Sequence, residues 1–111
     1  KTAVLVESPL DVVRFAAVFS DVQALASFGA TVSADQMRLL SFLCDKVIVA
    51  MDNDEAGKES SKRLAAKMSP PRSGILWWNY KNTSAKDIGD MTDEEIREGC
   101  MTASVVPPWI F

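Results

Sequence analysis

Short apolar runs alternate with amphipathic segments along the whole chain. The clearest run is Val47 to Met51, in which five apolar residues follow one another and the first three are β-branched. A short run of this kind is typical of a strand that is buried on both faces of a parallel sheet. Similar runs occupy residues 3–6, 22–26 and 75–78. The pattern therefore predicts four strands.

The segments between these runs have the periodicity and the end signals of helices. A Ser or Thr that can cap a first turn stands before three of them: Ser8, Ser33 and Thr92. Pro9 suits a first helical turn, and Glu95 completes a capping box with Thr92 for a last, short helix. The third helix is predicted over residues 55–68, and residues 69–74 stop it. Apolar faces are expected at Val12, Val13, Phe15, Ala16 and Phe19 in the first helix, and at Met37, Leu39, Leu40 and Leu43 in the second.

Strands and helices alternate four times, which predicts a three-layer α/β/α, Rossmann-like domain around a mainly parallel, four-stranded sheet. We expect the strand order 2-1-3-4, because it brings Glu7, after the first strand, beside Asp52 and Asp54, after the third. A length of 111 residues fits a single domain, residues 1–111. The chain does not begin with Met and its first strand starts almost at once, so we expect a domain from a longer protein.

Composition and charge narrow the class of protein. Hydrophobic residues make up 48% of the chain and charged residues 24%, as in ordinary soluble domains, and no apolar run approaches membrane-spanning length. The chain has no His, and Cys44 and Cys100 are far apart, so we expect reduced cytosolic thiols rather than a zinc site. Because the net charge is -3, the chain alone is not expected to bind nucleic acid by neutralising phosphates.

Carboxylates are the candidate chemistry. Six of them stand at or near the same ends of the predicted strands: Glu7, Asp11, Asp52, Asp54, Asp87 and Asp90. Parallel strands all point the same way, so these acids meet at one edge of the sheet, where open α/β sheets bind ligands. Oxygen ligands without His or Cys suit Mg²⁺ or Mn²⁺. The chemistry implied is phosphoryl or nucleotidyl transfer, or phosphodiester cleavage.

Several of these residues also have simpler explanations. Asp54 can cap the third helix, although capping explains only one of the two acids after the strand. Asp11 suits a first helical turn because an acid there favours the helix dipole, and Asp90 can simply flank the last helix. Lys58 is a candidate for binding nucleotide, with a solvated helix face as the alternative.

Four stretches resemble parts of TOPRIM domains, which DNA primases, topoisomerases and some nucleases share. Residues 4–11 resemble the glutamate-containing first motif, and residues 47–57 resemble the Asp-x-Asp motif. Residues 86–91 resemble a phage-primase version of the third acidic motif. Residues 24–40 resemble the segment of bacterial and phage primases in which a strand ends at Gly before a capped helix. The chain thus resembles the TOPRIM domain of a bacterial or phage-type DNA primase.

The resemblance implies a role for each acid. Glu7 would be the catalytic general acid–base or a metal ligand, and Asp52 and Asp54 would be ligands of Mg²⁺ or Mn²⁺. The remaining three would be supporting acids: Asp11, Asp87 and Asp90. The chain departs from the family pattern in two places, because Ser8 stands where the first motif usually has Gly and the third motif spaces its acids differently.

The resemblance also implies a reaction and partners for the intact protein. It would synthesise RNA primers from ribonucleoside triphosphates on single-stranded DNA, in the cytoplasm of a bacterial cell or a phage-infected host. A replicative helicase is a further expected partner, and a membrane is not. Primases carry a zinc-binding domain and a basic subdomain before TOPRIM, so we expect this fragment alone to have little or no activity.

Other functions stay open at this point. A TOPRIM nuclease would use the same acids with water as the nucleophile, and a non-catalytic docking module could meet a helicase through the apolar C-terminal tail. A type I topoisomerase needs a nucleophilic tyrosine, and the only one in the chain is Tyr80, beside a loop.

The tail over residues 105–111 is apolar and contains Pro107 and Pro108, which prevent it from extending a helix. We expect it to fold back onto the sheet with Trp109 as the anchor, because small domains need every large side chain for their core. A docking surface for another domain is the alternative.

Overall fold

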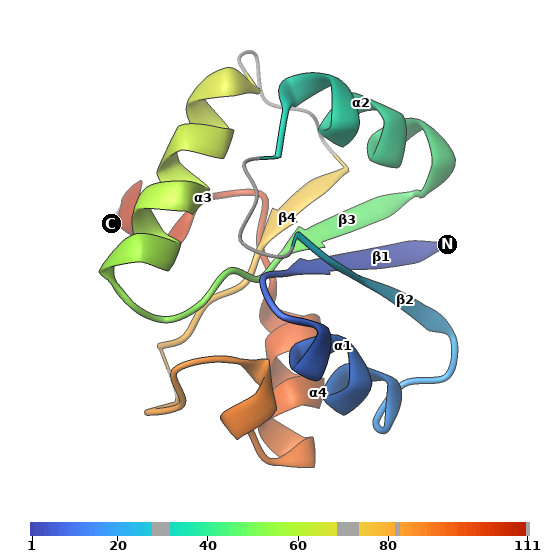
Figure 1. Cartoon of the computed structure of the whole chain (residues 1–111), viewed down its shortest axis with the longest axis vertical. Coiled ribbons are helices and arrows are strands. Elements are labelled where there is room, and N and C mark those ends of the chain that lie inside the picture. The colour runs from blue at the N-terminus through green and yellow to red at the C-terminus, as the bar shows by residue number, and fades with distance from the viewer. Residues whose placement is uncertain (28–31, 69–73, 82, 111) are drawn as a thin grey trace.

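A parallel sheet lies between two layers of helices in the computed structural model of the chain (Figure 1). The structure describes residues 1–27, 32–68, 74–81 and 83–110. Within these residues the sheet has four strands: β1 (Thr2–Val6), β2 (Val22–Ala26), β3 (Lys46–Val49) and β4 (Ile75–Trp77). Their order is β2-β1-β3-β4, and each neighbouring pair is parallel. The predicted fold class and strand order are confirmed.

Helices cover both faces of the sheet. The described residues form α1 (Pro9–Ala16), α2 (Ala34–Leu43), α3 (Glu55–Lys67) and α4 (Asp93–Thr102). Helices α1 and α4 lie on one face, and α2 and α3 lie on the other (Figure 1). Because side chains alternate along a strand, β1 contributes to both cores. Val4 and Val6 pack in the cluster that contains Phe15 of α1, whereas Leu5 packs in the cluster that contains Met37 of α2.

The predicted caps are present at the helix starts. The Ser8 hydroxyl accepts a hydrogen bond from the Leu10 amide (3.2 Å). Ser33 and Thr92 each form a complete capping box with the residue three positions later. Local side-chain chemistry therefore sets where these helices begin.

Two elements end at other residues than predicted. Strand β3 ends at Val49, before the predicted end of the apolar run. Helix α4 continues to Thr102, well beyond the expected short helix. It passes through Gly99, where an added Cβ would lie 1.9 Å from the Trp78 ring. This glycine therefore permits close packing of helix on indole rather than ending the helix.

The buried stripe predicted for α2 is partly wrong. Met37 is fully buried and Leu40 packs beside it, but Leu39 and Leu43 are each 59% exposed. With 3.6 residues per turn, positions 37, 40 and 44 share one face, whereas 39 points away from that face and 43 lies at its side. The same geometry leaves Val13 of α1 67% exposed between the buried residues at positions 11 and 15.

The C-terminal tail folds back beside α3, as predicted (Figure 1). Ser104 pairs with Trp77 in an antiparallel bridge, with N···O distances of 2.8 and 3.2 Å. A short 3-10 turn, η2 (Pro108–Ile110), follows. The Trp109 ring meets the Trp77 ring edge to face, with 5.2 Å between the centroids. Trp109 is thus the anchor that the sequence predicts. Val105 and Ile110 are 54% and 62% exposed, so the fold-back buries only part of the apolar tail.

Parts of three predictions lie outside the described residues: the helix stop at 69–73, the segment at 28–31 and Phe111. Among the helices that the structure does describe, none has the length and apolar character needed to cross a membrane.

Candidate metal centre

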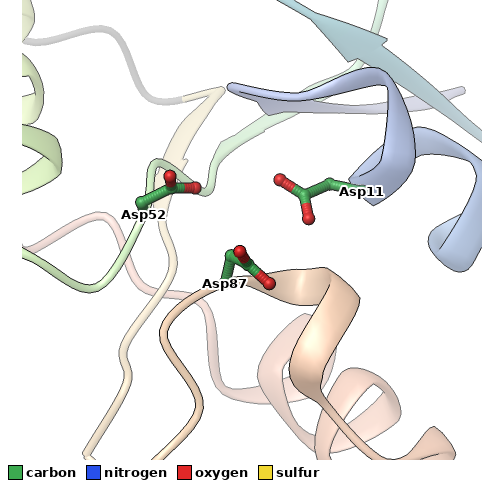
Figure 2. Close-up of side chains that lie close together, drawn as sticks. All are labelled: Asp11, Asp52 and Asp87. Carbon is green, nitrogen blue, oxygen red and sulfur yellow. The ribbon is translucent and has the colours of Figure 1, made fainter.

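Three carboxylates converge at the C-terminal edge of the sheet. Asp11, Asp52 and Asp87 each offer an oxygen, and these oxygens lie within 4.8 Å of one another. Figure 2 shows the three side chains pointing into one space from α1, from the turn after β3 and from the loop after β4. This is the edge at which the sequence predicts a ligand site.

Asp11 is the most deeply buried of the three, with 2% of its surface exposed. Its Oδ1 accepts a hydrogen bond from the Gly89 amide (2.9 Å). Its Oδ2 is buried and has no hydrogen-bond partner in the described structure. Burial raises the pKa of Asp11, and the nearby carboxylates of Asp87 and Glu7 add to the rise.

Asp52 links the group to Glu7. The Asp52 amide donates to Glu7 Oε1 (3.2 Å), while the Asp52 Oδ1 is buried without a partner among the described residues. Burial, followed by the charges of Glu7, Asp11 and Asp87, raises the pKa of Asp52 to about 7. The structure therefore holds this carboxylate where ionisation is costly unless a cation is present.

Asp87 is placed by the loop that carries it. Its Oδ1 accepts from the Asp90 amide (3.0 Å) and so caps the 3-10 turn η1 (Ile88–Asp90). Asn53 fastens this loop to the end of β3, because its side-chain amide donates to the Ala85 carbonyl (3.0 Å). Its backbone amide also donates to the Lys86 carbonyl (2.6 Å).

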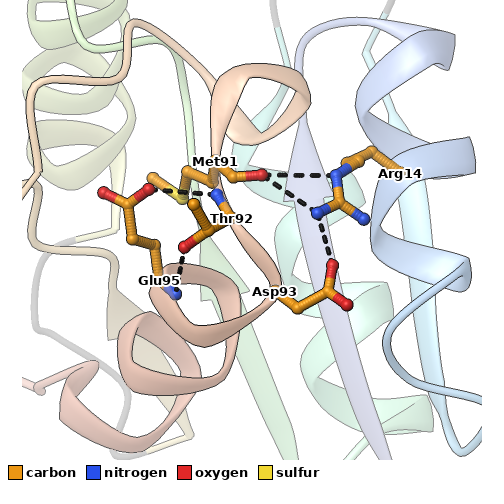
Figure 3. Close-up of polar contacts among 5 residues, drawn as sticks. All are labelled: Arg14, Met91, Thr92, Asp93 and Glu95. Carbon is orange, nitrogen blue, oxygen red and sulfur yellow. Dashed lines mark hydrogen bonds and ion pairs between the residues drawn. The ribbon is translucent and has the colours of Figure 1, made fainter.

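Arg14 ties the far end of the same loop to α1. Its guanidinium donates twice to the Met91 carbonyl, at 3.0 and 3.3 Å, and forms an ion pair with Asp93 (Figure 3). The capping box of Thr92 and Glu95 lies directly beside this contact (Figure 3). The loop is therefore held at both ends, and Asp87 and Gly89 between them face Asp11.

Not all of the predicted site residues join this group. Asp54 is exposed, and its Oδ1 caps α3 by accepting from the Gly57 amide (2.7 Å). Asp90 is exposed and contributes its amide to Asp87, and Lys58 is exposed on α3. The proposed metal-binding roles of Glu7 and Asp54 stay predictions.

The residues present fit a hard divalent cation. Two buried carboxylate oxygens lack any hydrogen-bond partner in the described structure, and burying such groups unpaired is costly. The only donors in the group are carboxylate oxygens, as Mg²⁺ and Mn²⁺ prefer. A cation held by Asp11, Asp52 and Asp87 would offset the cost of keeping these carboxylates charged and close together.

The hydroxyl of Tyr80 is occupied by a hydrogen bond within the fold. It donates a hydrogen bond to the Met51 carbonyl (2.7 Å), and burial together with the nearby acids raises its pKa. Both effects disfavour a tyrosine nucleophile and hence the topoisomerase alternative.

The sequence interpretation assigned no role to Asn53, although it stands between Asp52 and Asp54. Its position inside the Asp-x-Asp motif was the available signal. What could not be predicted is its partner, since Ala85 is 32 residues away in sequence.

Comparisons with solved structures agree with this fold. A DNA primase domain from Pseudomonas aeruginosa matches with 18% identity and a TM-score of 0.75, over 94% of this chain and 34% of that one. The DnaG primase catalytic domain bound to ssDNA matches with 23% identity and a TM-score of 0.71, over 93% of this chain and 34% of that one. A small TOPRIM domain protein from Bacillus stearothermophilus matches with 19% identity and a TM-score of 0.64, over 91% and 83%.

The chain thus spans about a third of the length of these primase chains. No curated protein matches it by sequence. The sequence model of the family described as Toprim-like matches residues 4–92, which is most of the chain. This chain belongs to the Toprim-like family.

Proposed function

We propose that this chain is the metal-dependent catalytic domain of a DNA primase, which synthesises RNA primers on single-stranded DNA by nucleotidyl transfer. The observation that carries the proposal is the group of three carboxylates with two buried, unpartnered oxygens. The likeness of the fold to primase domains supports it, and so does the position of the group at the ligand-binding edge of the sheet.

The residues of the chain would divide the work. Asp11, Asp52 and Asp87 would hold Mg²⁺, with Asp54 as a further candidate ligand. When bound, the cation would supply charge neutralisation at a triphosphate. Glu7, which accepts a hydrogen bond from the Asp52 amide, would take up the proton of the 3′-hydroxyl as its oxygen bonds to the α-phosphorus and pyrophosphate leaves. The buried position of Asp11 would keep water from one side of the group.

Calorimetric titration with Mn²⁺ tests the site. We expect the wild type to bind and the double variant Asp52→Ala, Asp87→Ala to lose at least about tenfold in affinity, because two of the three carboxylates are gone. Asp21→Ala is the matched control, since Asp21 is an exposed acid just before β2, at the other edge of the sheet. Equal affinity in the double variant and the wild type would overturn the site.

Asp54 needs a variant that separates its two roles. Asn caps helices about as well as Asp but carries no charge. If Asp54 is a ligand, Asp54→Asn lowers the Mn²⁺ affinity while the melting temperature without metal stays near that of the wild type. Unchanged affinity assigns Asp54 to capping alone.

The activity of the isolated chain should be low. With a net charge of -3, we expect weak association with single-stranded DNA that falls further as salt rises. Incubation with a labelled oligonucleotide, Mn²⁺ and ribonucleoside triphosphates should yield little primer. Metal-dependent shortening of the oligonucleotide would instead favour the nuclease alternative.

A further inference from the structure

A cavity of about 220 Å³ adjoins the acids on the α3 side of the sheet. It lies between the ends of β3 and β4, the first turns of α3 and the folded-back tail. Asp52 and Asn53 form its boundary toward the three carboxylates. The cavity and the candidate metal centre therefore share Asp52.

One wall of the cavity is aromatic. Trp77 and Trp109 line it, and their rings meet edge to face with 72° between the planes. Trp77 is buried, whereas Trp109 is half-buried and so has ring surface open to a ligand. Met51 and Tyr80 extend this wall, with the Tyr80 hydroxyl already bonded to the Met51 carbonyl. The wall thus offers flat apolar surface with few free polar groups.

The lining of the cavity also includes two basic side chains. Lys58 of α3 and Lys81 after β4 line it. In the part of the chain that the structure describes, neither lysine side chain forms an ion pair. Both ammonium groups are available to an anionic ligand. The cavity that they line also borders the three carboxylates, which suit a divalent cation.

We propose that this cavity binds the base of a nucleotide, with the phosphate chain directed past the two lysines toward the metal centre. Cavities that hold whole drug-sized ligands measure about 300–1,000 Å³, so one of about 220 Å³ suits a single ring system with its remaining groups outside. Any nucleic-acid base can stack on an aromatic side chain, because every base has a flat π-face. The inference rests on the proposed function, because the metal centre would hold the far end of the same ligand.

Three ligands test binding of the base and binding of the phosphates separately. Calorimetry in Mg²⁺ would compare ATP, inorganic triphosphate and the oligonucleotide dA10. Triphosphate should bind more weakly than ATP by about tenfold, because it lacks the stacking base. Trp109→Ala should remove that difference and leave the triphosphate affinity unchanged. A loss of dA10 affinity in Trp109→Ala, with ATP unaffected, would assign the cavity to a base within a strand and overturn the nucleotide site.

Matched variants control for loss of structure. Trp109→Phe keeps an aromatic ring and should retain most of the ATP advantage. Lys58→Ala and Lys81→Ala should weaken both ATP and triphosphate, whereas Lys62→Ala, at an exposed position of the same helix that does not line the cavity, should weaken neither. Far-UV circular dichroism would confirm that each variant is folded.

The outcomes distinguish this inference from the proposed function. If triphosphate binds and ATP gains nothing over it, or if Trp109→Ala leaves the ATP affinity unchanged, the base site is overturned and the metal centre stands. If neither triphosphate nor Mn²⁺ binds, the proposed function fails as well.

Discussion

Asp11 and Asp52 are the residues at which stability and function oppose each other. Each places a carboxylate oxygen in a buried position without a hydrogen-bond partner in the described structure, and each has its pKa raised chiefly by burial. Like charges so close together repel one another. A folded state without metal therefore carries a cost that a bound cation would offset.

We expect metal-free Asp52→Asn to be more stable than the wild type at pH 8. The pKa of Asp52 is about 7 in the folded protein and about 3.9 in an unfolded chain, so between these values the folded state binds more protons. Stability of the wild type therefore falls as the pH rises through this window. The variant lacks this contribution, so its advantage in melting temperature should grow from pH 5 to pH 8. Thermal melts in EDTA measure it.

Asp21→Asn, at an exposed position, should show no such growing difference. Adding Mn²⁺ should reverse the order at pH 8, because a ligand that binds only the folded state stabilises it. A variant that is less stable than the wild type at pH 8 without metal would contradict the prediction.

At the scale of single residues, the acids of the site could be identified from the sequence, but their contacts in the folded chain could not. Glu7, Asp52 and Asp87 could be identified because each follows the end of a strand. The burial of Asp11 could not, since it depends on the Gly89 amide, 78 residues away. A first-turn acid that favours the helix dipole and one that faces a metal look the same in sequence.

The loop between β4 and α4 is the element on which the candidate metal centre depends. Asn53 fastens its residues 85 and 86 to the turn after β3, and Arg14 fastens its end to α1. Because the turn η1 is a single short turn, these side chains rather than its own backbone keep Asp87 in place.

Arg14→Ala should therefore weaken Mn²⁺ binding, by roughly three- to tenfold, although Arg14 is not a ligand. Removing the guanidinium takes both donors from the Met91 carbonyl and breaks the ion pair with Asp93, so this end of the loop is no longer fastened to α1. Hydrogen exchange at the Gly89 and Asp90 amides should become faster in the variant. Mn²⁺ calorimetry and exchange measured by NMR give the two readouts.

Arg38→Ala is the matched control, because Arg38 pairs with Asp35 on the exposed surface of α2. Such pairs contribute little, so neither readout should change. If Arg14→Ala behaved like Arg38→Ala, the contacts of Arg14 with Met91 and Asp93 would have no part in forming the site.

Gly57→Ala should disturb the site from α3. An added Cβ at this position would lie 2.0 Å from the Asp52 carbonyl oxygen, so helix and turn would have to separate. We expect a loss of roughly 1–3 kcal/mol in unfolding free energy, together with weaker Mn²⁺ binding because Asp52 moves. Denaturant titration and calorimetry measure the two effects. Glu59→Ala, at an exposed position of the same helix, should produce neither.

Element boundaries could be predicted where neighbouring residues set them, but not where a contact distant in sequence sets them. The starts of α1, α2 and α4 could be predicted because the capping side chains are adjacent in sequence. The end of α4 could not, because Gly99 serves a contact with Trp78. Likewise, apolar content alone did not reveal that Leu39 and Leu43 face away from the sheet.

At the scale of the whole molecule, the tail covers part of the core between the sheet and helices α2 and α3. Truncation after Val106 should lower the melting temperature by several degrees, because Trp109 no longer covers Trp77. Truncation after Ala103 should lower it further, because the bridge between Ser104 and Trp77 is lost too. Differential scanning calorimetry of the two truncations separates ring packing from the bridge. An unchanged melting temperature in both would mean that the tail stabilises nothing within this chain.

The strand order could be predicted because a single requirement, that the acids after the first and third strands meet, leaves few arrangements of a parallel sheet. The order β2-β1-β3-β4 meets that requirement. The aromatic cavity could not be predicted in this way. It needs β3, β4, α3 and the tail together, and the apolar tail indicates burial without indicating what it encloses.

The bridge at Ser104 also bears on self-association. An outer strand of a sheet normally presents unpaired amides and carbonyls that another chain can extend, which is a route to aggregation. Strand β4 is only three residues long, and the Trp77 amide and carbonyl are both occupied by Ser104. The sheet is thus closed to strand addition at the C-terminal end of this border, and β2 forms the opposite border.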